Sequence, residues 1–397
     1  MVMMLTRLGS LHALEQTKGL SGWARSLGGP LPSADTIARS CTTLDLGVLR
    51  QINRDIYAQL KRRKALQPLA AGWIPLVLDA HESHASYDHH CKGCLERQIK
   101  HKDGDGKETT RTQYYHRYVA GILVTRDLNL LLDEEPLQPG EDEIAAAVRL
   151  VTRLVEHYPR AFDIVLGDGL YARADFFNPV TALGKYVLAV LKDENRDLMA
   201  DMRSLLDAQQ PITFARGGVQ VQAWDMDGFK TWPQVNANIR VIRTLETAHP
   251  TTGREGQAET STSERHIRPR STSPATSPPG PTSNAASEWV WVTTAPKVCF
   301  NTMAAVHFGH SRWVIENQGF NEIANHWHAD HVYTHHPHAL RACLLLLFLA
   351  YNIFHAFWRG NLKPALRLRH TMLHIAAMIQ AAFRSEGLPH IPARAPT

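Results

Sequence analysis

Three acidic residues of this 397-residue chain lie where carboxylates can do metal chemistry. Asp79 closes the apolar run 73–80, and Asp168 follows the apolar run 162–166 and stands between two glycines. Glu316 lies in a segment, 310–322, whose spacing predicts a helix. Two strand-end aspartates and one helical glutamate can converge on hard divalent cations such as Mg²⁺ or Mn²⁺, which prefer oxygen ligands. Two such ions would serve an in-line phosphoryl displacement.

The same residues also fit purely structural roles. An Asp at the end of a strand commonly caps a helix or forms a turn. Arg312 stands at helical i,i+4 spacing from Glu316, so the two would form a surface ion pair. We favour a phosphate contact for Arg312, because a guanidinium binds phosphate with a planar fork.

Apolar periodicity predicts the elements that must position these acids. Strands are predicted over 73–80, 114–125, 162–166 and 185–191, an amphipathic helix over 141–158, and a polar loop over 81–113. The order strand, strand, helix, strand, short helix, strand predicts an α/β domain with one mixed sheet. Sites in open α/β sheets form at the carboxyl ends of strands, where both aspartates stand.

The first seventy residues are predicted to be helical. Ser33 is placed to cap one helix, and a second helix is expected from Leu46 to Leu66. This second helix ends in a basic cluster, Lys61, Arg62, Arg63 and Lys64. The cluster has two interpretations: it complements the partial negative charge of a helix C-terminus, or it contacts nucleic-acid phosphates.

The second half of the chain has three parts. Residues 212–245 and 289–294 have strand character, and a Ser-, Thr- and Pro-rich segment, 248–287, is expected to be disordered. From Ala304 onward the chain is expected to be helical and rich in His. The apolar run 344–358 falls short of the ~20 residues that span a bilayer, so it predicts a buried helix.

A cluster of Cys and His residues suggests a second metal. Cys91 and Cys94 have zinc-knuckle spacing, and His89 and His84 stand close enough in sequence to complete a tetrahedral structural Zn²⁺ site. The alternative is a flexible loop with free thiols and exposed imidazoles. A redox role for this C-x-x-C fits less well, since nothing around it is thioredoxin-like. His81 shares a strand face with Asp79 and is a candidate donor beside the metal site.

Composition sets broad limits. The chain is 44% hydrophobic and 20% charged, which excludes collagen-like and wholly disordered proteins. Its 43 Lys and Arg against 38 Asp and Glu leave a net charge of +5, which permits a polyanionic partner without requiring one. An odd set of five Cys and the lack of a secretory signal favour a reducing, intracellular compartment and no membrane.

Three stretches resemble the DDE transposases of bacterial insertion sequences, which have an RNase H-like catalytic domain. They are LVLDAHE at 76–82, IVLGDGLYARADFF at 164–177 and HSRWVIENQGFNEIANHW at 310–327. The last is similar to the family's helix signature, in which an Arg precedes the catalytic Glu by four positions. The family also has a Tyr seven residues before that Glu and a Lys seven after it, where this chain has Gly309 and Ile323.

The resemblance implies that Asp79, Asp168 and Glu316 form a catalytic triad that binds two Mg²⁺ (or Mn²⁺) ions. It implies an RNase H-like mixed sheet flanked by helices over 71–200 and 295–360. A β-rich insertion would occupy 201–294, after a helical N-terminal DNA-binding region at 1–70 and before a C-terminal tail at 361–397.

The implied activity is metal-dependent cleavage of DNA at element ends followed by strand transfer to target DNA. The implied partners are double-stranded DNA, as terminal inverted repeats and target, and a second copy of the chain. The implied location is the bacterial cytoplasm, at the nucleoid. Two alternatives stay open: an RNase H-like nuclease without strand transfer, and a catalytically inactive DNA-binding derivative.

Overall fold

The computed structural model describes residues 1–20, 23, 27–102, 108–192, 196–248, 286–315, 321–334 and 336–384. Glu316 and residues 249–285 of the Ser- and Pro-rich segment lie outside the described residues. Both aspartates and the helix that leads to the glutamate lie within them.

Among the described residues before the sheet, the helices are α1 (Val2–Leu5), α2 (Leu11–Glu15), α4 (Ala34–Cys41) and α5 (Leu46–Arg62). As expected, the Ser33 hydroxyl caps α4 by accepting the Thr36 N–H. Asp45 caps α5 in the same way, accepting the Gly47 N–H at 2.7 Å. The helix ends earlier than expected, because the backbone at Lys64 turns to a positive φ of 54°.

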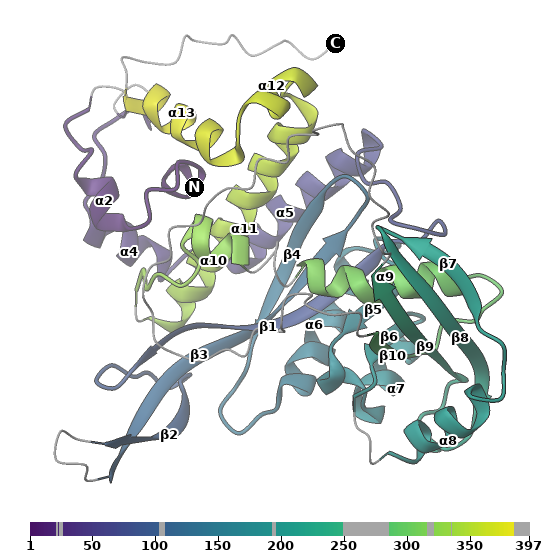
Figure 1. The fold of residues 1–397 in the computed structure, drawn as a ribbon. Coiled ribbons are helices and arrows are strands. Elements are labelled where there is room, and N and C mark those ends of the chain that lie inside the picture. The colour runs from purple at the N-terminus through teal and green to yellow at the C-terminus, as the bar shows by residue number, and fades with distance from the viewer. Residues whose placement is uncertain are drawn as a thin grey trace.

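The part of the sheet around the two aspartates contains β1 (Pro75–Ser86), β3 (Glu108–Val124), β4 (Asn129–Pro136), β5 (Ile164–Gly167) and β6 (Tyr186–Val190). They lie in the order β4-β3-β1-β5-β6, with β3 antiparallel to β1 and β4, and β5 parallel to β1 and β6. The predicted α/β fold with one mixed, RNase H-like sheet flanked by helices is confirmed (Figure 1).

Helices cover both faces of this sheet. The connections carry α6 (Glu143–His157), the 3-10 turn η1 (Gly169–Tyr171), α7 (Ala174–Ala182) and α8 (Asp197–Leu206). Alternation along β1 sends Leu76 and Leu78 into the apolar core beneath α6 and α7, and sends Val77 into the opposite core with the C-terminal helices. Both faces of β1 are therefore dry up to Leu78, immediately before Asp79.

The insertion between Asp168 and the last helices continues the same sheet. It contains β7 (Ile212–Arg216), β8 (Val219–Phe229), β9 (Ile239–Ala248) and β10 (Ser287–Thr293). These strands are antiparallel to one another, and β10 joins them to β6, with Trp291 opposite Val190. The insertion thus shares one ten-stranded sheet with the strands that lead to Asp79 and Asp168 (Figure 1).

The expectation of a loop over 81–113 is wrong. Strand β1 runs on to Ser86, and a further strand, β2 (Leu95–Lys102), pairs along its whole length with β3. This two-stranded ribbon, β2 with the first half of β3, extends away from the rest of the sheet (Figure 1). Most residues of this ribbon are exposed to solvent, and many of them are polar. The sequence therefore lacks the alternation of apolar residues by which a strand is predicted.

Strand β4 was not predicted either. Its sequence, NLLLDEEP, has three consecutive acidic residues, yet Asp133, Glu134 and Glu135 are all buried. Their ion-pair partners are arginines of three surrounding helices: Arg50, Arg149, Arg153 and Arg341. This pairing makes the burial tolerable, and sequence alone does not show it.

The C-terminal part contains α9 (Thr302–Ile315), α10 (Asn321–Trp327), α11 (Pro337–Gly360), α12 (Pro364–Arg369) and α13 (Met372–Arg384). By length and composition α11 could cross a membrane, but 61% of its most apolar window is buried inside the protein. The side-chain amide of Asn352 in α11 donates hydrogen bonds to the Asn53 side chain of α5 and to the Leu131 carbonyl of β4. These contacts make α11 a core helix, as its interrupted apolar run predicted.

Candidate active site

The pairing of two parallel strands places Asp79 and Asp168 at the same point of the sheet. In the β1–β5 register, Pro75 lies opposite Ile164 and Val77 opposite Leu166. Continued by two residues, this register sets Asp79 opposite Asp168. Both follow buried apolar residues and stand at the edge of the dry core. Two acids that are far apart in sequence thus stand at the same level of adjoining parallel strands, and the charges of both act on Tyr171.

Close packing shapes the turn that holds Asp168. A side chain on Gly167 would come within 2.5 Å of Tyr171, so only glycine fits there. The Asp168 carboxylate accepts the Leu170 N–H at 2.8 Å and caps η1. The predicted alternative, a capping role for this Asp, is therefore real. This hydrogen bond uses one carboxylate oxygen of Asp168, Oδ1, and leaves the carboxylate able to accept further bonds or to bind a cation.

Sequence reasoning missed a third carboxylate at this place. Glu143, at the start of α6, is 7% exposed and accepts the Tyr171 hydroxyl at 2.8 Å. Arg117 of β3 forms an ion pair with its other oxygen, at 2.8 Å. The position of Glu143 at the start of a helix gives no signal in sequence, because an acidic residue there is ordinary dipole complementation.

The charges of the three carboxylates and the burial of Tyr171 change the pKa values of Tyr171 and Glu143. Burial raises the pKa of Tyr171 well above its ordinary value, and the charges of Glu143, Asp79 and Asp168 raise it further. Burial likewise raises the pKa of Glu143; the Tyr171 hydroxyl and Arg117 oppose this shift, and the charge of Asp168 adds to it. Tyr171 therefore stays protonated and donates its hydrogen bond to Glu143, within reach of the charges of Asp79 and Asp168.

Helix α9 leads directly to the predicted third member of the triad. It packs against β1, β5, β6 and β9 and ends at Ile315, the residue before Glu316. His310 fixes it to β9 through a 2.7 Å contact with Glu246. Glu316 itself lies outside the described residues, so its meeting with Asp79 and Asp168 stays a prediction.

A second contact ties the chain after Glu316 to the strand of Asp79. His81 Nε2 lies 2.6 Å from the Asp330 carboxylate, in the segment that follows α10. His81 was predicted as a donor beside the metal site. The structure shows it holding the 328–334 segment against β1, two residues from Asp79 on the same strand.

The predicted DNA-binding residues lie on two separate helices. Arg312 is partly exposed in the last turn of α9. Lys61 and Arg62 form the last turn of α5, and Arg63 and Lys64 follow it; all four are exposed. Their positive charges complement the partial negative charge at the C-terminus of α5. Because they are exposed, they are also accessible to the phosphates of a nucleic acid, so both interpretations stay open.

The Cys and His cluster differs from its predicted form. Cys91 and Cys94 lie together, but the imidazole beside them is His116 of β3, which sequence reasoning missed. His89 is not part of this group, and the side chain of His84 lies outside the described part of the structure. His116 is distant in sequence, and only the strand pairing places it near the C-x-x-C turn.

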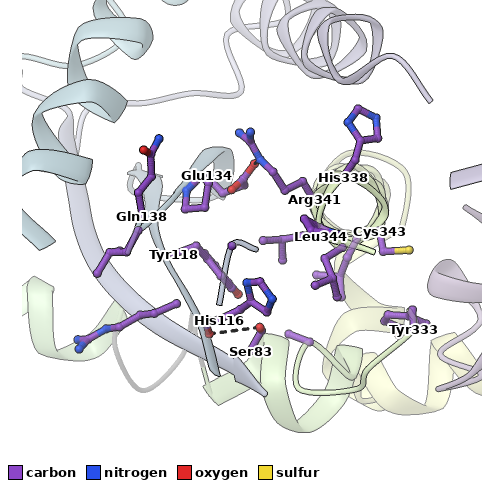
Figure 2. A pocket seen from close by; sticks show the side chains of 18 of the residues that line it. Ser83, His116, Tyr118, Glu134, Gln138, Tyr333, His338, Arg341, Cys343 and Leu344 are labelled. Atoms are coloured by element: carbon purple, nitrogen blue, oxygen red, sulfur yellow. Dashed lines mark hydrogen bonds and ion pairs between the residues drawn. The ribbon is translucent and has the colours of Figure 1, made fainter. Parts of the chain in front are cut away.

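Two cavities flank this region. One, of about 590 Å³, runs from Leu170 and Glu143, beside Asp168, to Tyr115 and Cys94. The other, of about 370 Å³, lies between β3, β4 and α11, and neither Asp79 nor Asp168 lines either cavity. Figure 2 shows Glu134 and Arg341 at its wall, where Arg341 Nε donates to Glu134 Oε1 at 2.9 Å. We place the candidate site at the aspartates, since Glu143 and Leu170, which line the first cavity, are both linked to Asp168: the Leu170 N–H bonds to it, and its charge acts on Glu143.

An RNase H-like sheet with paired strand-end aspartates defines the class of metal-dependent enzymes that cut or join polynucleotides. Consistent with this, the family model for the transposase DDE domain matches residues 141–353, more than half of the chain. The chain belongs to this family. The match includes Asp168 and Glu316, whereas Asp79 precedes it. No protein in a search of curated proteins matches the chain.

Transposase DDE domains generally use divalent metal ions, and the residues present fit such ions. Asp79 and Asp168, on adjoining strands, would offer hard oxygen ligands to such an ion. A cation held there would also offset the repulsion between Asp168 and Glu143, which raises the pKa of Glu143.

Proposed function

We propose that this protein is a transposase that cuts DNA at the ends of a mobile element and joins the freed strands to target DNA. The register that sets Asp79 opposite Asp168 carries this proposal, together with membership of the transposase DDE domain family. Asp79, Asp168 and Glu316 are the proposed ligands of two Mg²⁺ or Mn²⁺ ions. Bound there, the ions would supply charge stabilisation for the attacking and leaving oxygens.

Two phosphoryl transfers make up the proposed reaction. In the first, water attacks a phosphodiester at the element end: a new P–O bond forms, the P–O3′ bond breaks, and a 3′-hydroxyl and a 5′-phosphate result. In the second, that 3′-hydroxyl attacks a phosphodiester of the target, forming the joint and releasing a target 3′-hydroxyl. Each step depends on positioning and on charge stabilisation more than on covalent catalysis.

The chain's own residues orient the reactants. Arg117 and Tyr171 hold Glu143 in place beside Asp168, so the acidic groups keep a fixed geometry. Arg312 would contact a phosphate next to the scissile one, with its planar fork. Lys61, Arg62, Arg63 and Lys64 would contact the backbone of the element end, an interaction that weakens steeply with salt.

The proposed partners follow from the reaction. Two element ends must be brought together, so we infer a dimer or larger assembly of this chain on double-stranded DNA. Such a protein acts where the genome lies, in the cytoplasm of a bacterial cell at the nucleoid. Apart from α11, a mostly buried helix, no described helix is long and apolar enough to cross a membrane.

The test uses the full chain, a DNA end cut beforehand and a supercoiled target, with Mg²⁺ or Mn²⁺. Joined product supports the transposase, and cutting without joining supports the nuclease. Asp79→Asn, Asp168→Asn and Glu316→Gln should each lower joining by about a hundred-fold or more, the effect of losing several kcal/mol of charge stabilisation. The matched control is Asp197→Asn, an exposed residue at the start of α8.

Three results would contradict the proposal. Full joining by Asp168→Asn would show that the acid has no part in the reaction. An equal loss in Asp197→Asn would show that the effect is not specific to the site. Specific DNA binding with neither cutting nor joining, in either metal, would support the inactive DNA-binding alternative.

A further inference from the structure

The turn formed by Cys91, Lys92, Gly93 and Cys94 directs backbone N–H groups at both of its sulfurs. The Gly93 N–H donates to Cys91 Sγ at 3.3 Å, and the Cys91 N–H donates to Cys94 Sγ at 3.1 Å. The Cys94 N–H closes the turn by donating to the Cys91 carbonyl at 3.1 Å. N–H groups in these positions would stabilise the negative charge that the two sulfurs carry when they ligate a metal.

His116 completes a compact group of three ligands. Its Nε2 lies 3.3 Å from Cys91 Sγ and 3.4 Å from Cys94 Sγ, and the two sulfurs are 3.6 Å apart. Around tetrahedral zinc, bonds of about 2.3 Å to sulfur and 2.0–2.1 Å to nitrogen place ligand atoms about 3.5–3.8 Å apart. The three observed distances lie within a few tenths of an ångström of these values.

Neither a simple hydrogen bond nor a disulfide accounts for this group of half-buried side chains. One Nε2–H of His116 can donate to one sulfur, yet this nitrogen lies almost equally close to two. The sulfurs are much farther apart than the ~2.05 Å of a disulfide. A single cation bound by all three atoms accounts for the arrangement.

We propose that Cys91, Cys94 and His116 bind a structural Zn²⁺ ion. The fourth tetrahedral position is left for water or a further side chain. This site is separate from Asp79 and Asp168 and does not depend on the proposed reaction. The chemistry selects zinc over Mg²⁺ or Mn²⁺, because thiolate and imidazole are poor ligands for hard cations.

The ion fixes the base of the β2–β3 ribbon. The C-x-x-C turn stands immediately before β2, and His116 lies in β3, where the β1–β3 register shifts between Glu82 and His84. An isolated two-stranded ribbon is only marginally stable in water. The turn also borders the cavity that reaches Glu143 and Leu170, so zinc would fix one wall of the space beside Asp168.

The first test measures metal in the full-length protein, purified without added metal or chelator. The wild type should contain one zinc ion per chain. His116→Gln and Cys94→Ser should lose it, whereas Cys299→Ser, an exposed free Cys, and His89→Ala should retain it. Retention of full zinc by His116→Gln, loss of it by His89→Ala, or a Cys91–Cys94 disulfide in place of zinc would overturn the assignment.

A second test does not depend on how the variants fold. The wild-type protein is stripped of metal and titrated with Co²⁺, whose visible spectrum reports tetrahedral coordination and thiolate ligands. A tetrahedral, thiolate-type spectrum that one equivalent of Zn²⁺ abolishes supports the site; an octahedral spectrum overturns it. Stripping should also accelerate proteolysis within residues 86–114, and unchanged cleavage would overturn the role in the ribbon.

Discussion

The indole ring of Trp291 occupies the space that a side chain on Gly309 would need. A Cβ built on Gly309 would lie 2.4 Å from Trp291 Cε2 and 2.5 Å from its Nε1. Trp291 belongs to β10 and is 1% exposed. The contact explains why this chain has a glycine seven residues before Glu316, where the resemblance leads one to expect a tyrosine: strand β10 already fills the space.

Replacement of this glycine should therefore weaken the docking of α9. We expect Gly309→Ala to lower the free energy of unfolding by about 1–3 kcal/mol, the usual effect of overpacking. Chemical denaturation measures the change. The control is Gly360→Ala at the end of α11, where a Cβ meets no heavy atom within 4 Å and alanine should stabilise by up to about 1 kcal/mol. Equal effects of the two substitutions would exclude a role for Trp291.

The contact between His81 and Asp330 gives a second prediction. It holds the segment that follows Glu316 against the strand of Asp79, so its loss should misplace catalytic groups while leaving DNA affinity unchanged. We expect His81→Ala and Asp330→Ala each to slow strand joining by about ten-fold, and the double variant to be no slower than either. Additive losses would mean that the two residues act independently.

Stability in acid should depend on Glu322. Burial opposes ionisation of this carboxyl, but bonds from His355 and Trp327 and the charge of Arg7 hold its pKa below the ordinary 4.5. A lowered folded-state pKa stabilises the protein above the ordinary value, and this contribution disappears as pH falls through the folded-state pKa. Glu322→Gln should thus melt below wild type at pH 7 and approach it near pH 3.

The measurement is the melting temperature at a series of pH values for both proteins. Glu156→Gln is the control, because Glu156 is exposed on α6 and should not change the pH dependence. A constant difference between wild type and Glu322→Gln at every pH would show that the carboxylate contributes through packing alone.

Local patterns predict one part of this molecule well. Ser33 as a cap, the apolar strands of the sheet and the aspartates at strand ends all depend on residues near one another in sequence. The carboxyl ends of parallel strands lie at one edge, so the proximity of Asp79 and Asp168 also follows from the pattern. Membership of the family was predicted from the same stretches.

Local patterns do not predict the contacts that depend on how strands pair and how helices pack on the sheet. His116 meets the C-x-x-C turn only because β3 pairs with β1 and β2. Glu143 approaches Asp168 only because α6 packs over the sheet. Such partners have no spacing rule in sequence. Strand β4 is the clearest case, since its acids resemble a loop until their arginine partners are known.

The last prediction concerns that strand. Asp133 is 1% exposed and lies 2.9 Å from Arg50 of α5 and 2.7 Å from Arg153 of α6. Removal of its charge leaves two largely buried guanidiniums short of a partner. We expect Asp133→Asn to lower the free energy of unfolding by about 3–5 kcal/mol, whereas Asp127→Asn, an exposed residue, should cost under about 1 kcal/mol.

Because Arg50 lies on α5, the same change should loosen the N-terminal helices from the sheet. Hydrogen exchange at the α5 amides, Leu46–Arg62, measures this and should quicken more in Asp133→Asn than in Asp127→Asn. Exchange that quickens equally throughout the sheet would instead mean that Asp133 stabilises the whole fold and that α5 has no separate mode of opening. In that case α5, with the basic cluster Lys61–Lys64 at its end, and the sheet that leads to Asp79 and Asp168 would unfold as one unit.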